Sequence, residues 1–233
     1  MDHNKKSKEA ANAEYLRSMN FNPGKPYDEE KVDKKKTFLI ICEGKNTEPL
    51  YFEGFPVPSK AVVTLGGKNS NNKLVEFALL EREKPEYKDR EVWCVFDMDI
   101  KPDEGATQPE DFNSAIEKAE SAGLNVAWSN DAFELWFVLH YQTLDSSLTR
   151  HELYPILKTK WELESFDKTA KTEDFCLGHY DRHLEVSGSS QKQALKRAKQ
   201  LHESYGGAKN YASQCPCTTV YKLVNELNKN LKD

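Results

Sequence analysis

Residues 37–48 read TFLIICEGKNTE, and this stretch decides the fold. The run from Thr37 to Cys42 is continuously apolar and carries no charge, which is typical of a strand buried on both faces of a parallel sheet. A turn at Gly44 ends the strand, and the spacing of Thr47 to Phe55 predicts a short amphipathic helix. The stretch therefore predicts the strand, turn and helix that open an α/β unit.

The same alternation continues along the chain. Further strands are predicted at Ala61 to Leu65, Glu91 to Phe96 and Leu124 to Ser129, and helices at Lys73 to Glu83 and Asn113 to Ala122. Strands that alternate with helices over short connections indicate a mainly parallel central sheet flanked by helices, with right-handed crossovers. Ligands of such doubly wound sheets bind at the carboxyl ends of the strands.

The last third of the sequence has a different character. An apolar helix is predicted at Asp131 to Tyr141, followed by helices at Leu148 to Thr159, Ser189 to Tyr205 and Thr218 to Leu231, with an acidic, irregular stretch at Glu162 to Asp174. We therefore predict a polar, peripheral N-terminal arm over 1–33, an α/β core over 34–145, and a mostly helical C-terminal extension over 146–233 that packs on the core.

The overall charge narrows the possible functions. The chain has 233 residues, with 33 Lys and Arg against 38 Asp and Glu, so its formal net charge is −5. This balance argues against a protein that coats nucleic acid through bulk positive charge. No apolar run is long enough to span a bilayer, and the first residues lack the apolar stretch of a signal peptide, so we expect no membrane association and a cytoplasmic location.

Acidic residues follow two of the predicted strands directly. Glu43 comes after TFLIIC, and Asp97 and Asp99 come after EVWCVF. Residues i and i+2 of a strand point to the same face, so Asp97 and Asp99 can converge on one ion, and Glu43 would lie about 5 Å away on a neighbouring strand. Clustered carboxylates repel one another unless protons or cations offset the repulsion. An all-oxygen set of this kind suits Mg²⁺, or Mn²⁺ in its place.

A divalent ion at that edge of the sheet indicates phosphoryl transfer. The ion would neutralise a phosphate and activate water, while a remaining carboxylate could move a proton. The same site could serve attack by a hydroxyl instead of water, and strand-terminal acids are also common as helix caps and turn formers. The pairing of Glu43-Gly44 with Asp97-x-Asp99 on two strand ends favours the metal site over the capping roles.

This arrangement resembles the Toprim domain of topoisomerases, primases and OLD-type nucleases, which carries Glu-Gly after its first strand and Asp-x-Asp after a later one. ICEGKNTEPLYF at 41–52, VWCVFDMD at 92–99 and SNDAFELWFVLHY at 129–141 further resemble the RloB family. Members of that family are similar to the AbiL abortive-infection component and are often encoded beside an ATPase or restriction genes. The resemblance is strong over residues 37–141 and weak over the remainder.

The resemblance implies a Toprim-like, Mg²⁺-dependent nuclease that acts in anti-phage defence by abortive infection, with a nucleic-acid substrate and an ABC-type ATPase as partner. By motif position, Glu43 would be a general acid/base or a metal ligand, and Asp97 and Asp99 would bind Mg²⁺. Glu48 stands where related nucleases carry a second acid, although its spacing from Glu43 is one residue longer than in OLD nucleases.

Several further residues are weaker candidates. Glu134, on an otherwise apolar helix, completes the metal site or is a surface acid at the helix N-terminus. Lys45 and Lys68 follow the first two strands and could reach a phosphate, Lys45 as part of the catalytic set. Ser129 and Asn130 end the strand before the apolar helix, where they bind substrate or cap that helix.

A basic stripe is the last feature of the sequence with a bearing on function. Lys192, Lys196 and Lys199 share one face of a predicted helix, and that face binds a nucleic-acid backbone or is simply solvated. The prediction is thus a metal-dependent nuclease. The alternative is a catalytically silent, metal-stabilised module that binds nucleic acid or protein in a defence or restriction operon.

Overall fold

The structure is a computed structural model in which the chain divides into two units, Met1–Lys34 and Lys35–Asp233. It describes residues 35–58, 60–67, 71–99, 107–184 and 188–231, all of which belong to the second unit. The arm predicted over 1–33 lies outside the described residues. None of the helices in these ranges is long and apolar enough to cross a membrane.

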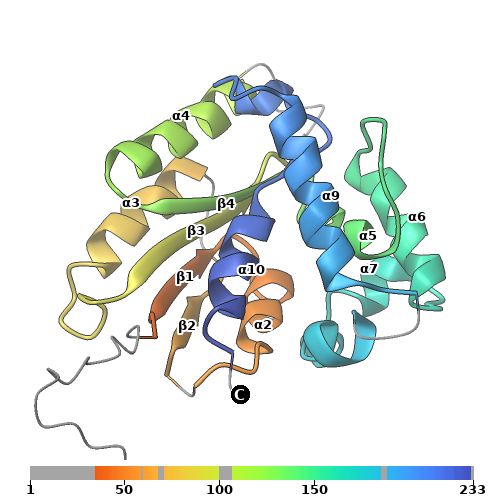
Figure 1. The fold of residues 1–233 in the computed structure, drawn as a ribbon, viewed down its shortest axis with the longest axis horizontal. Helices are drawn as coiled ribbons and strands as arrows, with labels where there is room; N and C mark the ends of the chain where they lie inside the picture. The colour runs from red at the N-terminus through yellow and green to blue at the C-terminus, as the bar shows by residue number, and fades with distance from the viewer. Residues whose placement is uncertain (1–34, 59, 68–70, 100–106, 185–187, 232–233) are drawn as a thin grey trace, which may run out of the picture. The chain divides into compact units, whose positions relative to one another are not determined.

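A five-stranded sheet in the order β2-β1-β3-β4-β5 lies at the centre of the described chain (Figure 1). Its strands are β1 (Phe38–Cys42), β2 (Val62–Leu65), β3 (Glu91–Asp97), β4 (Asn125–Asn130) and β5 (Cys217–Thr218). The first four are parallel, and β5 pairs antiparallel with β4. The predicted α/β class with a mainly parallel sheet is confirmed. Because the chain winds outward in opposite directions from β1, the switch point where ligands bind lies between β1 and β3.

Helices cover both faces of this sheet. The helices of the α/β part are α2 (Thr47–Glu53), α3 (Asn71–Glu81), α4 (Thr107–Ser121) and α5 (Glu134–Tyr141). Successive strand residues point to opposite faces, so Leu39 and Ile41 pack in one apolar core with α3 and α4. Phe38 and Ile40 pack in a second core with α2 and α5. The fully buried sequence FLIIC is thus explained by helices on both sides of β1.

The C-terminal extension adds helices to the second of these cores. Its elements are α6 (Arg150–Lys160), α7 (Phe166–Thr169), α8 (Glu173–Cys176), a π-helical turn (His179–His183), α9 (Gln191–Ser204), a 3₁₀ turn (Tyr211–Ser213) and α10 (Val220–Asn228). Ala194 and Ala198 on α9 and Leu223 on α10 are buried in the core that also holds Phe38. In Figure 1, α10 crosses in front of the sheet and α9 lies to its right, whereas α3 and α4 lie to its left and upper left.

Several boundaries differ from the sequence-based prediction, and the largest shift is at α4, which begins at Thr107 rather than Asn113. The last helix begins at Val220 rather than Thr218, because Cys217 and Thr218 pair with β4 and extend the sheet. The stretch at Glu162 to Asp174 is not wholly irregular, since it contains α7 and the start of α8. Phe166 anchors α7 by stacking on Tyr154 at a ring distance of 4.3 Å. These contacts are tertiary, and local periodicity does not reveal them.

Candidate functional site

Glu43 and Asp97 meet at the carboxyl ends of neighbouring strands. Glu43 directly follows β1, and its N–H donates to the carbonyl of Val95 on β3 at 3.0 Å. Asp97 is the last residue of β3, and its N–H donates to Glu43 Oε2 at 3.3 Å. Since β1 and β3 flank the switch point of the sheet, these two carboxylates occupy the position where doubly wound folds bind ligands.

Two further carboxylates are buried beside this pair. Glu48 lies in the first turn of α2 and is 6% exposed, and Glu134 begins α5 and is 5% exposed. A Cβ atom added to Gly44 would lie 2.0 Å from Glu48 Oε2. The glycine of the Glu-Gly motif is therefore needed because the Glu48 carboxylate packs directly against the backbone of the turn.

These acids line a cleft with a volume of about 320 Å³. The described residues that line it are Glu43, Gly44, Lys45, Asn46, Thr47, Glu48, Asp97, Asp99, Phe133, Glu134, Arg150, Tyr154 and Lys171. The acids, together with Lys45, come from the α/β part, whereas Arg150, Tyr154 and Lys171 come from the helical extension. Lys45 is exposed at the rim, and its side chain lies close to Gly67.

Burial and the neighbouring acids disfavour the charged forms of Glu48 and Asp97. Burial is the largest cause that raises the pKa of Glu48 to about 7, and the charges of Glu134 and Glu43 add to it. Burial also raises the pKa of Asp97 well above its usual range, with further contributions from Glu48, Glu43 and Glu134. Four carboxylates thus interact electrostatically as one cluster, and a cation placed among them would relieve the repulsion.

One oxygen of the cluster lacks a partner within the described residues. Asp97 Oδ2 accepts a hydrogen bond from the N–H of Phe133 at 2.9 Å. Asp97 Oδ1 is buried and has no hydrogen-bond partner in the described chain. A buried carboxylate oxygen without a donor costs free energy, and polar groups left in this state often belong to functional sites.

The donor set fits a hard divalent cation. Its candidate ligands are carboxylate oxygens, without Cys or His, as Mg²⁺ and Mn²⁺ prefer. Within the described ranges, no three His, Cys, Asp or Glu side chains are arranged to hold a metal ion as they stand. Mg²⁺ is commonly held by one or two carboxylates together with waters and substrate phosphate oxygens. Asp97 and Glu43 would supply such a pair.

A comparison with protein families identifies the relatives of the chain. The family model described as RloB-like protein matches residues 38–227, which include both strands that carry the acids and most of the helical extension. The chain belongs to the RloB-like family. Comparisons with curated proteins and with solved structures gave no match.

In this RloB-like chain, Asp99 lines the cleft but pairs with a cation of the helical extension. Its carboxylate pairs with the guanidinium of Arg150, and its N–H donates to the carbonyl of Asp131 at 3.1 Å. The expectation that Asp97 and Asp99 share a face assumed that the strand continues to Asp99. However, β3 ends at Asp97, and Asp99 has a φ of 46°, so the two-residue period of a strand no longer applies.

Arg150, Lys171 and Tyr154 are residues of the cleft that sequence reasoning missed. Arg150 is the first residue of α6, which a capping box between Thr149 and Glu152 initiates. The Thr-x-x-Glu pattern is visible in the sequence and marks the start of a helix. Nothing local indicates, however, that this helix start faces β3 and β1, which end about 50 and about 110 residues earlier in the chain.

The remaining candidates lie elsewhere. Ser129 and Asn130 are fully buried and do not line the cleft: Ser129 Oγ lies 3.0 Å from Thr218 Oγ1, and Asn130 Nδ2 donates to the carbonyl of Ala212 at 2.9 Å. In the structure, these hydrogen bonds hold β4 against β5 and against the 3₁₀ turn that precedes it. Lys68 lies outside the described residues.

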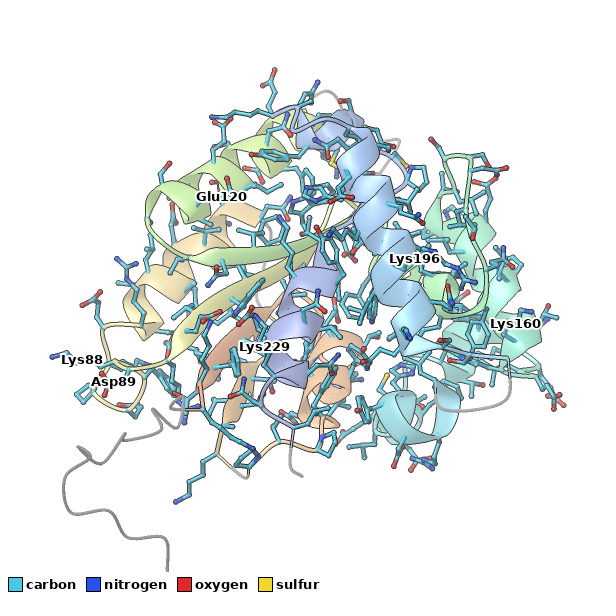
Figure 2. The ribbon with its side chains drawn as sticks, in the orientation of Figure 1. Lys88, Asp89, Glu120, Lys160, Lys196 and Lys229 are labelled. Carbon is cyan, nitrogen blue, oxygen red and sulfur yellow. The ribbon has the colours of Figure 1, made fainter. Side chains whose placement is uncertain are left out.

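The basic stripe on α9 is separate from the acidic cleft. Lys192 and Lys196 are exposed, and neither lines the cleft. Figure 2 labels Lys196 on α9. Lys199 pairs with Glu203 at 3.6 Å, which neutralises part of the stripe.

Proposed function

We propose that this RloB-like protein is a Toprim-type, metal-dependent nuclease that hydrolyses a phosphodiester bond of DNA or RNA with Mg²⁺ or Mn²⁺. The observation that carries the proposal is the cluster of Glu43, Glu48, Asp97 and Glu134 at the switch point of the sheet. Burial and the neighbouring acids raise the pKa values of Glu48 and Asp97, and Asp97 Oδ1 lacks a hydrogen-bond partner in the described chain.

Each part of the cleft has a defined role in this proposal. Asp97 and Glu43 would hold the ion, with Glu134 and Glu48 as further oxygens beside them. A bound divalent ion supplies charge neutralisation at the phosphate and lowers the pKa of a coordinated water. Asp97 is kept in place by its hydrogen bond from Phe133, and Glu43 by its bond from the Asp97 N–H. Such fixed geometry is what in-line displacement at phosphorus requires.

The biological setting is also part of the proposal. The RloB-like membership, together with the resemblance to abortive-infection components, supports a role in anti-phage defence beside an ABC-type ATPase. Cells that carry the chain and its neighbouring ATPase gene should resist phage, and cells with Asp97→Asn in the same operon should not. Equal resistance with both alleles would contradict a nuclease-based defence.

A second function is favoured by one observation. Among the described residues, no group of three Asp, Glu, His or Cys side chains is arranged to hold a metal ion. This is compatible with a catalytically silent binding module. In that case the acids would hold a structural ion or dock a basic partner. The two functions differ in whether a phosphodiester bond is broken.

A cleavage assay separates them. Single-stranded and duplex DNA, RNA and tRNA are incubated with the protein in Mg²⁺, in Mn²⁺ or in EDTA, alone and with the partner ATPase. We expect cleavage that requires the metal and that falls by about a hundredfold or more in Asp97→Asn. Glu226→Gln, an acid at the opposite end of the sheet, is the matched control and should cleave like the wild type. Absence of cleavage under every condition would favour the binding module.

A further inference from the structure

The helical extension places two cations in the acidic cleft. Arg150 begins α6, and Lys171 lies between α7 and α8; both line the cleft that Glu43, Asp97 and Glu134 form. An anionic phosphodiester is repelled by a cluster of carboxylates, and one divalent ion offsets part of that charge. Additional cations beside the ion are therefore expected wherever such a cluster binds nucleic acid.

Arg150 is held in a fixed orientation by two acids. Its backbone N–H donates to Asp131 Oδ2 at 2.9 Å, and its Nε lies 3.6 Å from the same oxygen. Its Nη2 pairs with Asp99 Oδ1. A guanidinium has five N–H donors in a planar fork, and these contacts leave donors for a further ligand. The Arg150 side chain is 23% exposed, so it remains open to the cleft while its acids orient it.

Lys171 is positioned by an aromatic hydroxyl and by one acid of the cluster. Its Nζ donates to the hydroxyl of Tyr154 at 2.7 Å and lies 3.8 Å from Glu134 Oε1. The Lys171 side chain is 43% exposed. A contact of 3.8 Å is longer than a hydrogen bond. The ammonium therefore lies near Glu134 without donating a hydrogen bond to it.

The role of Asp99 follows from these contacts. Its carboxylate is paired with the guanidinium of Arg150, whereas the carboxylate of Asp97 accepts the backbone N–H of Phe133. In contrast to Asp97, Asp99 thus faces a cation from the extension. Bidentate recognition of phosphate by arginine requires that the guanidinium be held in the correct plane, and the paired carboxylate provides this restraint.

We propose that Arg150 and Lys171 bind the phosphate of the nucleic-acid substrate, and that Asp99 is a positioning residue that orients Arg150 rather than a metal ligand. The inference rests on the proposed function, because it assigns the phosphate-binding part of the same site. It also gives the extension a direct role, since α6 and the α7–α8 connection complete an active site whose acids come from the α/β core.

The first test measures binding without turnover. Fluorescein-labelled 20-mer single-stranded DNA and RNA are titrated with the protein in Ca²⁺, and gels confirm that the probes stay intact. Arg150→Gln and Lys171→Gln should each weaken binding of the better probe by tenfold or more, and Arg150→Lys should restore part of it. Arg82→Gln and Lys118→Gln are matched controls, because those cations pair with Glu83 and Glu76 outside the cleft and should leave binding unchanged.

The second test separates Asp99 from the metal ligands. Free Mn²⁺ is measured by electron paramagnetic resonance for the wild type, Asp99→Asn and Asp97→Asn. Asp99→Asn should change Mn²⁺ affinity by less than twofold and weaken probe binding by threefold or more, whereas Asp97→Asn should lose Mn²⁺ affinity by at least tenfold. Thermal melting of each variant verifies that it is folded.

Three results would overturn the inference. The first is probe binding by Arg150→Gln that equals that of Arg82→Gln. The second is a tenfold loss of Mn²⁺ affinity in Asp99→Asn, which would make Asp99 a ligand. The third is a wild type that binds neither probe. A wild type that binds the probes through Arg150 but never cleaves them would reject the nuclease proposal while the phosphate site stands.

Discussion

Acidic residues at the two ends of the central sheet have opposite surroundings: cations at one end and other acids at the other. At the amino ends of the strands, Lys36 lies 2.7 Å from Glu91 and 2.8 Å from Glu226, and Lys229 also pairs with Glu226. These lysines lower the pKa of Glu226. At the carboxyl ends, burial and neighbouring acids raise the pKa values of Glu48 and Asp97, and neither acid makes an ion pair with Lys or Arg in the described chain.

The ion pairs at the amino end stabilise the folded chain, whereas the clustered acids at the carboxyl end destabilise it. The amino-end acids have partners supplied by the protein; Lys229, at the end of α10, is labelled in Figure 2. At the carboxyl end, Glu48 and Glu134 are buried and Asp97 has one buried oxygen without a partner in the described chain, which costs folding free energy. Proteins retain such costs mainly at functional sites, where the missing partner is a ligand. The comparison therefore points to the carboxyl end as the site of an external cation.

Apart from the loss of Asp97 itself, the largest expected effect on cleavage comes from the turn that packs against Glu48. Gly44→Ala places a Cβ atom 2.0 Å from Glu48 Oε2, so the carboxylate has to move. We expect metal-dependent cleavage to fall by about tenfold or more, because a displacement near 1 Å is costly in a positioned site. Gly123→Ala is the control: φ is +75° there and its Cβ meets nothing within 4 Å. That variant should lose about 1 kcal/mol of stability and keep its cleavage rate.

Neutralising one acid at each end should change stability in opposite directions. In EDTA at pH 7, Asp97→Asn removes the cost of a buried, repelled carboxyl group and should raise the free energy of unfolding by about 1 kcal/mol. Glu226→Gln loses partly exposed ion pairs and should lower it by roughly 0.5 kcal/mol. Urea unfolding measures both variants. A destabilised Asp97→Asn would remove the basis for the contrast between the two ends.

The pH dependence of stability should also show that Glu48 is buried among other acids at the carboxyl end. Glu48 has a pKa of about 7 in the folded chain against a usual value of 4.5. Between these values the folded protein holds a proton that the unfolded chain has lost, so stability decreases as pH rises through this window. Without metal, we expect the contribution of Glu48 to fall by roughly 2–3 kcal/mol from pH 4.5 to 7.

Glu48→Gln isolates that contribution. Its stability, measured by urea unfolding in EDTA, should decline less over the same pH range than that of the wild type, because Gln does not titrate. Parallel pH curves for the two proteins would show that Glu48 is not buried among acids in solution.

The sequence predicted the parts of the fold that repeat a local pattern. The apolar runs identified β1 and β3, and the position of Glu43 and Asp97 at strand ends was enough to expect them at one edge of a parallel sheet. Glu134 could be singled out because it is the one acid in the apolar segment 132–139. These inferences depend on short-range periodicity and on the geometry of parallel strands.

The remainder depends on long-range packing that no local pattern encodes. The two residues of β5 are too few to show a period, yet their pairing with β4 buries Ser129 and Asn130 away from the cleft. Arg150 and Lys171 reach the acids through tertiary contacts of the extension. Asp99 leaves the strand geometry just after β3 ends, so its partner is Arg150.

Thermal melting with added Mg²⁺ tests the central claim, that the acids at the carboxyl end bind a divalent ion. If the dissociation constant is near 1 mM, 10 mM Mg²⁺ adds about 1.4 kcal/mol of stability, which raises the Tm of a chain of this size by roughly 3–6 °C. The account predicts this rise for the wild type and Glu226→Gln, and its loss in Asp97→Asn. An unchanged wild-type Tm, or an equal rise in Asp97→Asn, would contradict it.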